Sequence, residues 1–234
     1  NLSTQNTEAD YVLVDFIKNK LSYYAEYKND PSKNIGSNIS KYLNLGFISS
    51  QRVAIEVIKS KASIINKETF LEELIIRKEL ADNFCLYANN FKDFSGIPNW
   101  AKISLENHRY DIKPYIYSLA DFENANTHDI LWNATENQLK KEGGIHGYLR
   151  MYWAKKILEW AKNPNEALKI AVYLNNKYGY DAPSANGYAG ILWALGGLHD
   201  RAFADFFITG KIRKMTYNSL KRKYDLMNYI AKYK

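Results

Sequence analysis

Hydrophobic residues recur along most of the chain at steps of three and four residues, the spacing of the buried stripe of an amphipathic helix. Residues 29–38 interrupt this spacing with residues that favour turns. No run of alternating β-branched residues predicts a strand. The pattern therefore predicts an all-α protein. Its first buried stripe is expected to contain Tyr11, Val14, Phe16, Ile17, Leu21 and Tyr24.

Further helices are predicted after Ser49 and Ser50 and, at greater length, over residues 66–87. The chain contains no internal repeat and no low-complexity linker that would mark a domain boundary. We therefore expect residues 1–234 to form a single helical domain.

Two helix starts carry capping signals. Asn163 can cap a helix with Pro164 at its first position and Glu166 as a capping-box partner. Ser118 followed by Asp121 is a weaker signal of the same kind. Both pairs predict a helix that begins at the residue after the cap.

The helix predicted between Gly144 and Ala161 carries aromatic and charged residues on one face. An aromatic stripe at this spacing is more often plain core than a cofactor site. Arg150, in the middle of the stripe, would be costly to bury without a carboxylate partner, and Asp181 is the partner we expect. Such a pair beside two tryptophans indicates a polar pocket. The residues on this face are His146, Arg150, Trp153, Ile157 and Trp160.

Basic residues are concentrated at the C-terminal end of the sequence. The 234 residues have a formal net charge of +7, and residues 211–234 contain eight basic residues and one acidic residue. The rest of the chain is therefore balanced in charge. A basic patch beside a neutral body indicates a polyanionic partner, with nucleic acid as the first candidate. The alternative is a solvated basic helix that only keeps the protein soluble.

Composition excludes several classes of protein. A hydrophobic content of 46% excludes a disordered chain, and the longest apolar stretch, the ten residues 189–198, is too short to span a bilayer. No secretion signal is visible, and Cys85, the one cysteine, cannot form an internal disulfide. We expect a soluble intracellular protein without a membrane partner. Aromatic residues make up 15% of the chain, more than a core of this size requires.

Common catalytic and metal-binding motifs are missing from the sequence. It has no P-loop, no G-x-G-x-x-G and no G-x-S-x-G. Its four histidines lack zinc-site spacing, so we expect no metal. Cys85 lies in an apolar segment and is interpreted as a core residue rather than a nucleophile. Glu72 and Glu73 are adjacent, so on a helix they diverge and cannot act as an acid/base pair.

Several longer segments are more distinctive. They are Lys28-Asn29-Asp30-Pro31, Ser49-Ser50-Gln51-Arg52-Val53, Glu79-Leu80-Ala81-Asp82-Asn83-Phe84-Cys85, Thr127-His128-Asp129-Ile130-Leu131-Trp132-Asn133, His146 through Trp160, Tyr173-Leu174-Asn175, Gly210-Lys211-Ile212-Arg213 and Lys221-Arg222-Lys223-Tyr224-Asp225. In these segments the chain resembles class II cyclobutane pyrimidine dimer photolyases. The resemblance runs in collinear order over nearly the whole sequence.

The resemblance covers only the C-terminal, helical half of that family. The N-terminal α/β domain, where an antenna chromophore usually sits, has no counterpart here. We expect either a piece of a longer protein, a naturally short chain, or a form in which a separate α/β domain joins a monomeric helical one.

The family resemblance implies FAD as the cofactor, folded into a U inside the helical domain. Asn175 matches the asparagine beside flavin N5, and Arg150 with Asp181 matches an ion pair beside the isoalloxazine. Residues 37–40 match the segment that lines the diphosphate. The residues implied for FAD are Tyr24, Ser37, Asn38, Ile39, Ser40, Gln51, Arg52, Arg150, Asn175 and Asp181.

The resemblance also implies residues for repair of the dimer. Glu73 matches the acid that hydrogen-bonds the dimer, while Met151 and Trp193 match residues that contact the flipped bases. Together with Asn175 they form the implied catalytic set. Residues implied to meet DNA, with Asn29 filling the gap left by the flipped bases, are Lys28, Asn29, Arg201, Lys211, Arg213, Lys221, Arg222 and Lys223.

Aromatic residues are implied to carry electrons from the surface to the flavin. Trp132, Trp153 and Trp160 match the tryptophans of this route, and Tyr117 is a further candidate. Trp153 and Trp160 are two helical turns apart, about 10 Å along the axis. The order of the steps is not readable from the sequence, and Trp132 could offer an exit parallel to Trp160.

The sequence departs from the family pattern at three places. Lys41 stands where the phosphate motif usually has proline, Asn44-Leu45 replaces His-Phe, and residues 182–187 lack the usual Gly-Arg-Asp-Pro. The predicted function is light-driven, FAD-dependent repair of pyrimidine dimers in DNA. Two alternatives stay open: a cryptochrome-like flavoprotein that performs no repair, and a DNA-binding remnant that has lost its flavin.

Overall fold

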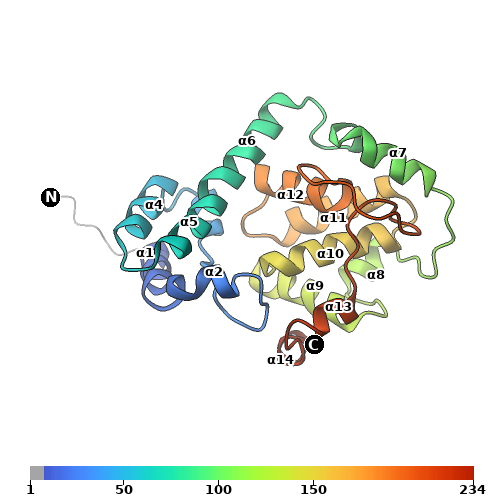
Figure 1. Cartoon of the computed structure of the whole chain (residues 1–234). Coiled ribbons are helices and arrows are strands. Elements are labelled where there is room, and N and C mark those ends of the chain that lie inside the picture. The colour runs from blue at the N-terminus through green and yellow to red at the C-terminus, as the bar shows by residue number, and fades with distance from the viewer. Residues whose placement is uncertain (1–7) are drawn as a thin grey trace.

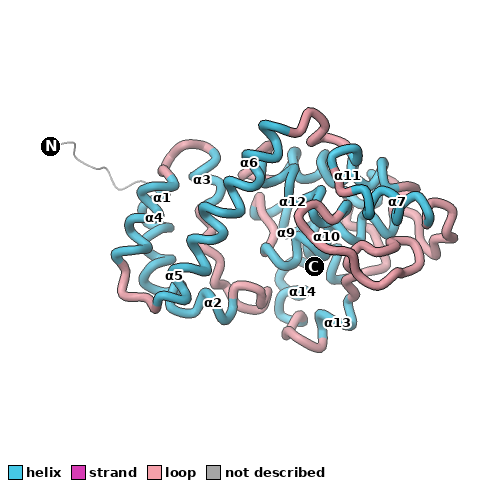
Figure 2. Tube along the Cα trace, turned by 45° about the horizontal axis from the view of Figure 1, so that its top comes forward, coloured by secondary structure: helices cyan, strands magenta, loops and turns pink. Residues whose placement is uncertain are grey.

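The chain folds into helices joined by loops (Figures 1 and 2). The structure, a computed structural model, describes residues 8–234. Among these residues the one β-type contact is an isolated antiparallel bridge between Phe206 and Gly210. The predicted all-α fold is confirmed.

Most helices are short, and the four longest, α9 to α12, follow one another along the chain. The helices are α1 Glu8–Asp15, α2 Tyr24–Tyr27, α3 Ser40–Asn44, α4 Ser50–Lys59, α5 Ile64–Leu71, α6 Lys78–Tyr87, α7 Asn99–Asn107, α8 Leu119–Glu123, α9 Ile130–Glu142, α10 Gly147–Trp160, α11 Pro164–Tyr178, α12 Ala185–Gly196, α13 Tyr217–Lys221 and α14 Met227–Tyr233. Two segments are π-helical, Phe16–Lys20 and Glu72–Arg77, and two are 3₁₀-helical, Leu21–Tyr23 and Phe94–Gly96.

The buried hydrophobic residues form two separate clusters. One, which we call the N-terminal cluster, draws its residues from positions 9–74, and the other, the C-terminal cluster, from positions 81–233. Helix α5, the π-helical segment and α6 follow one another without a break from residue 64 to residue 87 and run from the first cluster to the second (Figure 1). The long helix predicted over residues 66–87 is therefore confirmed, with a π-helical turn in its middle. That residues 1–234 act as one domain stays a prediction.

The predicted buried stripe of the first helix is partly wrong. Tyr11 and Val14 are 63% and 46% exposed, whereas Leu13 is buried. The reason is the π-helical segment Phe16–Lys20, whose wider turn separates the buried residues Phe16 and Leu21 by five positions. A constant period of 3.6 residues therefore places the stripe on the wrong side of α1.

The capping signals differ in their outcome. Ser118 and Asp121 form a complete capping box at the start of α8, with each side chain bonded to the other's backbone N–H. At α11, Asn163 Oδ1 accepts from Glu166 N at 2.9 Å, but no return bond from the Glu166 side chain is present in the described chain. The signal that is weaker in the sequence thus forms the fuller cap.

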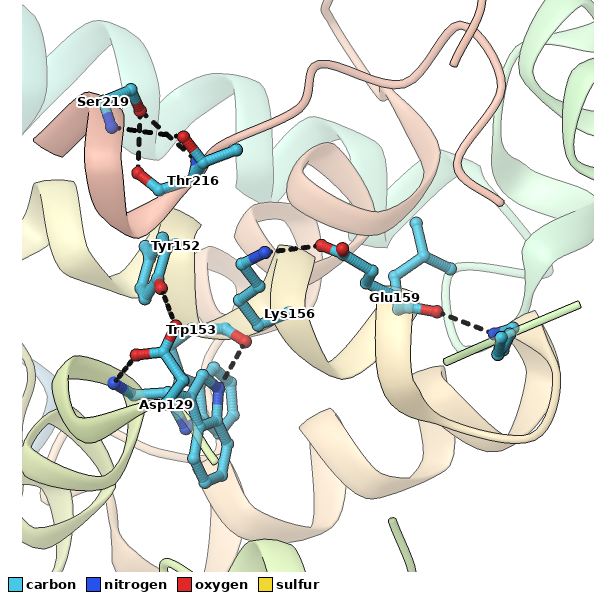
Figure 3. Close-up of polar contacts among 10 residues, drawn as sticks. Asp129, Tyr152, Trp153, Lys156, Glu159, Thr216 and Ser219 are labelled. Carbon is cyan, nitrogen blue, oxygen red and sulfur yellow. Dashed lines mark hydrogen bonds and ion pairs between the residues drawn. The ribbon is translucent and has the colours of Figure 1, made fainter. Parts of the chain in front are cut away.

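The C-terminal cluster is organised around α9 and α10. Asp129, the N-cap of α9, accepts from Trp132 N at 2.9 Å and also from the Tyr152 hydroxyl of α10. Figure 3 shows the Tyr152 side chain directed at Asp129, and Lys156 of the same helix paired with Glu159. One carboxylate therefore caps α9 and ties it to α10, which fixes how the aromatic residues of the two helices face each other.

Candidate functional site

Three tryptophans form a continuous aromatic chain inside the C-terminal cluster, and we call it the tryptophan chain. The rings of Trp153 and Trp132 are stacked, with centroids 6.5 Å apart, and the Trp132 and Trp160 rings meet edge to face at 6.3 Å. All three are at most 2% exposed. Trp132 therefore lies between the other two and the three rings are in contact in series, an arrangement that does not favour the predicted exit through Trp132 parallel to Trp160.

Hydrogen bonds hold the inner two rings of the tryptophan chain in place. Trp132 Nε1 donates to the Trp153 carbonyl oxygen at 3.0 Å, the bond drawn at Trp153 in Figure 3. Trp153 Nε1 donates to Glu136 Oε2 at 2.7 Å. Because both N–H groups are satisfied in the dry interior, each indole has one preferred orientation.

Other aromatic side chains extend the tryptophan chain to the surface. The Tyr117 and His128 rings lie 5.9 Å and 4.8 Å from the Trp160 ring, and Tyr117 Oη and His128 Nδ1 are 2.9 Å apart. His128 stacks at 3.8 Å on Tyr115, which is 46% exposed. Tyr117 was expected from the sequence, whereas His128 and Tyr115 were missed, because only the fold brings their two loops, before and after α8, to the end of α10.

Glu136 was also missed by the sequence prediction. It is completely buried in α9, and burial raises the pKa of its carboxyl group to about 7, although the hydrogen bond from Trp153 acts in the opposite direction. Its position, four residues after Trp132 and on the same face of the helix, is the signal that could have identified it.

The side chains implied for the isoalloxazine lie together at the open side of α10 and α11. Arg150 Nη2 is 3.6 Å from Asp181 Oδ2, and both side chains are partly exposed, so the expected ion pair is present but not deeply buried. Asn175 is buried in α11, and a Cβ atom built on Gly187 would lie 3.0 Å from Asn175 Nδ2. Gly187 therefore packs closely against the Asn175 amide, whose Nδ2 also donates to Asn176 Oδ1 at 3.2 Å.

The segment implied for the diphosphate has the backbone geometry of an anion site. Asn38 has φ = 55° and Ile39 is right-handed, and consecutive residues of opposite hand direct their N–H groups into one concave surface. No backbone N–H of residues 37–41 donates to another described residue. Lys41 Nζ lies 5.9 Å from the Tyr180 ring, next to Asp181, so this segment faces the one that carries the ion pair.

The remaining flavin candidates are less closely joined to this group. Tyr24 packs edge to face against Phe16 and Phe70 in the N-terminal cluster. Gln51 and Arg52 are exposed at the start of α4, and Arg52 Nε is paired with Glu56 of its own helix at 3.0 Å. No contact in the described chain joins Gln51 or Arg52 to the other flavin candidates.

The π-helical segment Glu72–Arg77 separates the two adjacent acids. Glu73 Oε1 pairs with Lys28 Nζ at 2.7 Å, whereas Glu72 pairs with Arg77 at 3.0 Å. As expected, the two carboxylates diverge. The structure thus brings together Lys28 and Glu73, one implied for DNA and the other for the dimer, and Asn29 follows Lys28 in the chain.

Met151 and Trp193 both pack, partly exposed, against the C-terminal cluster. The loop after α12 carries Arg201 and Arg213, whose guanidinium carbons lie 5.5 Å and 5.8 Å from the Phe203 ring. The two arginines that are expected to bind DNA therefore both form cation–π contacts with the Phe203 ring of this loop.

This loop is attached to the helix α7 by a histidine. His108 Nδ1 is 2.6 Å from Asp111 Oδ2, and His108 Nε2 is 2.9 Å from Asp205 Oδ1 in the loop. The two carboxylates raise the pKa of His108, with Asp111 as the larger cause. The Lys211 backbone N–H adds a bond to Ser104 Oγ at 2.7 Å.

The C-terminal basic residues Lys221, Arg222 and Lys223 are exposed at the end of α13. None of the three forms an ion pair with another described residue. They are therefore available to an anionic partner.

A hollow of about 700 Å³ between α7 and the start of α11 is lined by none of the predicted site residues. Within residues 8–234 no group of three or more His, Cys, Asp or Glu side chains could hold a metal ion, and no helix there is long and apolar enough to cross a membrane.

Curated proteins with similar sequences share one name. Over 222 residues the chain is 44% identical to the deoxyribodipyrimidine photo-lyase of Potorous tridactylus, an alignment that covers 94% of this chain and 42% of that protein. It is 44% identical to the photo-lyase of Oryza sativa, covering 92% and 43%, and 42% identical to that of Methanothermobacter thermautotrophicus, covering 94% and 48%. The chain thus spans less than half the length of each of these relatives. No family model matches it.

Solved structures show the same fold at low sequence identity. A bacterial class III photolyase from Agrobacterium tumefaciens matches with a TM-score of 0.74 at 19% identity, and a cryptochrome from Synechocystis with 0.74 at 17%. Each match covers 96% of this chain and 44% of the other. The chain therefore has the helical fold that this photolyase and this cryptochrome share, and nearly its whole length is homologous to part of the curated deoxyribodipyrimidine photo-lyases.

Proposed function

We propose that this chain binds FAD and uses light to repair cyclobutane pyrimidine dimers in DNA, as a photolyase of class II. The observation that carries the proposal is the buried tryptophan chain, which begins at Trp153, three residues after Arg150 on α10, and continues through Trp132 and Trp160. A stable fold needs no such series of contacting indole rings, whereas electron transfer to a flavin does. The curated relatives named deoxyribodipyrimidine photo-lyase support the same function.

The residues present fit a bound FAD. The free N–H groups of residues 37–41 suit the diphosphate, and Tyr24, Gln51 and Arg52 stay candidates for contacts around it. The Arg150–Asp181 pair and the Asn175 amide have the polar groups that suit the edge of the isoalloxazine. Lys41 and Tyr180 lie between these two groups.

When bound and reduced, FAD supplies on excitation the electron that splits the cyclobutane ring, and it recovers that electron afterwards. The chain's own residues position and feed this chemistry. Met151 and Trp193 give apolar and stacking contact to flipped bases, and Glu73 accepts from a base N–H. Asn175 can donate or accept at the flavin edge. Trp153, Trp132, Trp160 and Tyr117 carry electrons inward from the surface.

Contacts to DNA are proposed on the same side as the dimer site. Lys28 is held by Glu73 at 2.7 Å, and this partly exposed pair is weak enough to exchange for a phosphate and a base. Asn29 then fills the gap left by the flipped bases. Arg201, Lys211, Arg213 and the residues Lys221, Arg222 and Lys223 bind phosphates of the duplex.

Two other functions are less well supported. A cryptochrome-like protein that performs no repair has no need of Glu73, Met151 and Trp193. A DNA-binding remnant without flavin has no need of a buried tryptophan chain whose two inner indole N–H groups are hydrogen-bonded. An intracellular location, a monomeric state and a separate α/β domain as partner belong to the proposal as well.

Flavin binding is the first test. The purified chain is mixed with FAD, passed over a gel-filtration column and examined by absorption. We expect the blue absorption bands of oxidised flavin to elute with the protein and to bleach under blue light with an external reductant. Asp181→Asn should lower the bound fraction, whereas Asp225→Asn, an exposed acid of the tail, should not. Elution of the protein without flavin would show that the proposal is wrong.

A further inference from the structure

Glu136 is a completely buried acid in the helix α9. It is 0% exposed, its Oε2 accepts from Trp153 Nε1 at 2.7 Å, and its Oε1 has no hydrogen-bond partner among the described residues. Of the indole N–H groups in the described chain, that of Trp153 alone donates to a carboxylate. Packing does not account for an acid at this position, because a buried carboxyl group with one unsatisfied oxygen costs free energy that an apolar side chain would not.

No cation neutralises this acid directly. Lys140, one turn later on α9, lowers the pKa of Glu136 by its charge, and Glu123, near the end of α8, raises it, but neither forms an ion pair with Glu136. Burial is the largest effect, and it brings the pKa to about 7. Near neutral pH the group facing Trp153 is therefore a mixture of a neutral acid and an anion.

We propose that Glu136 is a positioning residue of the tryptophan chain: its hydrogen bond fixes the Trp153 ring, and its anionic form stabilises the positive charge that appears when Trp153 gives up an electron. This inference rests on the proposed function. In the step itself Trp153 loses one electron to the photoexcited oxidised flavin. No bond breaks, and the proton stays on Nε1. The single positive charge on the indole then faces the single negative charge on Glu136 across a dry contact, where the attraction is strong.

The direction of the pH effect follows from this arrangement. Above the pKa of Glu136 the anion favours loss of an electron from Trp153, and below it the neutral acid keeps the hydrogen bond but loses the attraction. In the following step the positive charge moves from Trp153 to Trp132. The Trp132 Nε1 donates to a neutral carbonyl oxygen, so no titrating acid is bonded to this second indole. Trp153 is thus the tryptophan whose loss of an electron depends on pH.

The decisive variant is Glu136→Gln, because an amide oxygen can still accept from Trp153 Nε1 while the charge is gone. Thr135→Val is the matched control, since Thr135 is equally buried and lies next to Glu136 on α9, while its hydroxyl donates to the Leu131 carbonyl oxygen and not to an indole. Photoreduction per absorbed photon is measured between about pH 5.5 and pH 8.5 and is normalised to the bound flavin. Tryptophan fluorescence of the flavin-free chain is titrated over the same range.

We expect the photoreduction yield of the wild-type chain and of Thr135→Val to rise about threefold with pH, with a midpoint near the pKa of Glu136. In Glu136→Gln the yield should stay at the low value throughout. The fluorescence of the flavin-free chain should titrate with the same midpoint, and this transition should vanish in both Glu136→Gln and Trp153→Phe.

Two results overturn the inference, and they are distinguishable. Flavin that binds and is photoreduced equally in Glu136→Gln and wild type leaves the proposed function standing and removes the role of Glu136. A chain that binds no flavin at all removes the proposed function and the inference together. A fluorescence transition that persists in Glu136→Gln assigns the titration to another group and also overturns the inference.

Discussion

The tryptophan chain and the surface that faces the expected substrate are built in opposite ways. In the tryptophan chain every ring is buried and in contact with the next, and the two inner indole N–H groups are bonded. At the surface that faces the expected substrate, by contrast, Glu73 is held by one partly exposed ion pair. The exposed residues Lys221, Arg222 and Lys223 form no ion pair with another described residue. The interior rings are therefore held in place by the protein alone, whereas these surface groups have few contacts with the rest of the protein.

This difference indicates where substitutions will be costly. A buried ring in a series has no substitute, so its loss should stop the proposed electron transfer. A partly exposed ion pair contributes little to stability, typically about 0–1 kcal/mol, so its loss leaves the fold intact and changes only binding or yield. The predictions below separate the two regions on that basis.

Trp132→Phe should have the largest effect. Because Trp132 lies between Trp153 and Trp160, its loss should abolish photoreduction of oxidised flavin, as should Trp153→Phe and Trp160→Phe. Repair by chemically reduced flavin should survive in all three variants. The matched control is Trp100→Phe, since Trp100 lies outside the chain of rings and packs at Gly197. Photoreduction that persists in Trp132→Phe would show that the rings do not act in series.

Removing the positive charges of Lys221, Arg222 and Lys223 together should weaken binding to damaged and undamaged DNA by similar factors. The logarithmic salt slope should fall by up to about 0.9 for each phosphate that the variant no longer neutralises. Asn29→Ala should instead reduce the preference for dimer-containing DNA. Binding is measured by fluorescence anisotropy at several salt concentrations. A change of lesion preference alone in the triple variant would contradict the role of these three residues.

Glu73→Ala should lower the repair yield per absorbed photon several-fold and leave flavin content and melting temperature nearly unchanged. Glu73→Gln should recover part of the yield, because its amide oxygen can still accept from a base N–H. Glu72→Ala is the control, because Glu72 points away and pairs with Arg77 at 3.0 Å. Repair is followed by the disappearance of dimers from a defined oligonucleotide. An unchanged yield in Glu73→Ala with full flavin content would remove Glu73 from the site.

The smallest expected effect is a pH dependence of the loop that carries Arg201 and Arg213. The pKa of His108 is raised by Asp111 and Asp205, so its stabilisation of the loop is complete below the unfolded value of about 6.5 and is lost as pH rises through the raised pKa. Amide exchange in the loop should therefore accelerate above neutral pH. Asp205→Asn should reduce this dependence, and Asp200→Asn should not.

The fold class could be predicted from the sequence because its signals are local. Helical spacing predicted the helix over residues 66–87, and a polar cap predicted the start of α8. The π-helical segments could not be predicted, since a five-residue turn depends on the packing of neighbours such as Phe16 against Phe70. The shift they cause explains why Tyr11 and Val14 face outward.

The candidate site was predictable where one side chain requires another. Arg150 in an aromatic stripe required an acid partner, and Asp181 supplies it. The serial order of the tryptophans depends on how α9 crosses α10, which no spacing along one helix specifies. The spacing of four residues places Glu136 on the same face of α9 as Trp132, but its hydrogen bond to the Trp153 indole depends on how the two helices cross.

The most direct test of the account is repair of a single defined thymine dimer by the flavin-loaded chain in the light and in the dark. The oligonucleotide is incubated with chain whose FAD has been chemically reduced, and intact thymines are quantified by chromatography. We predict repair that depends on blue light and on bound flavin and is absent in the dark. A chain that carries fully reduced FAD and binds the damaged DNA, yet restores no thymines under light, would contradict the account.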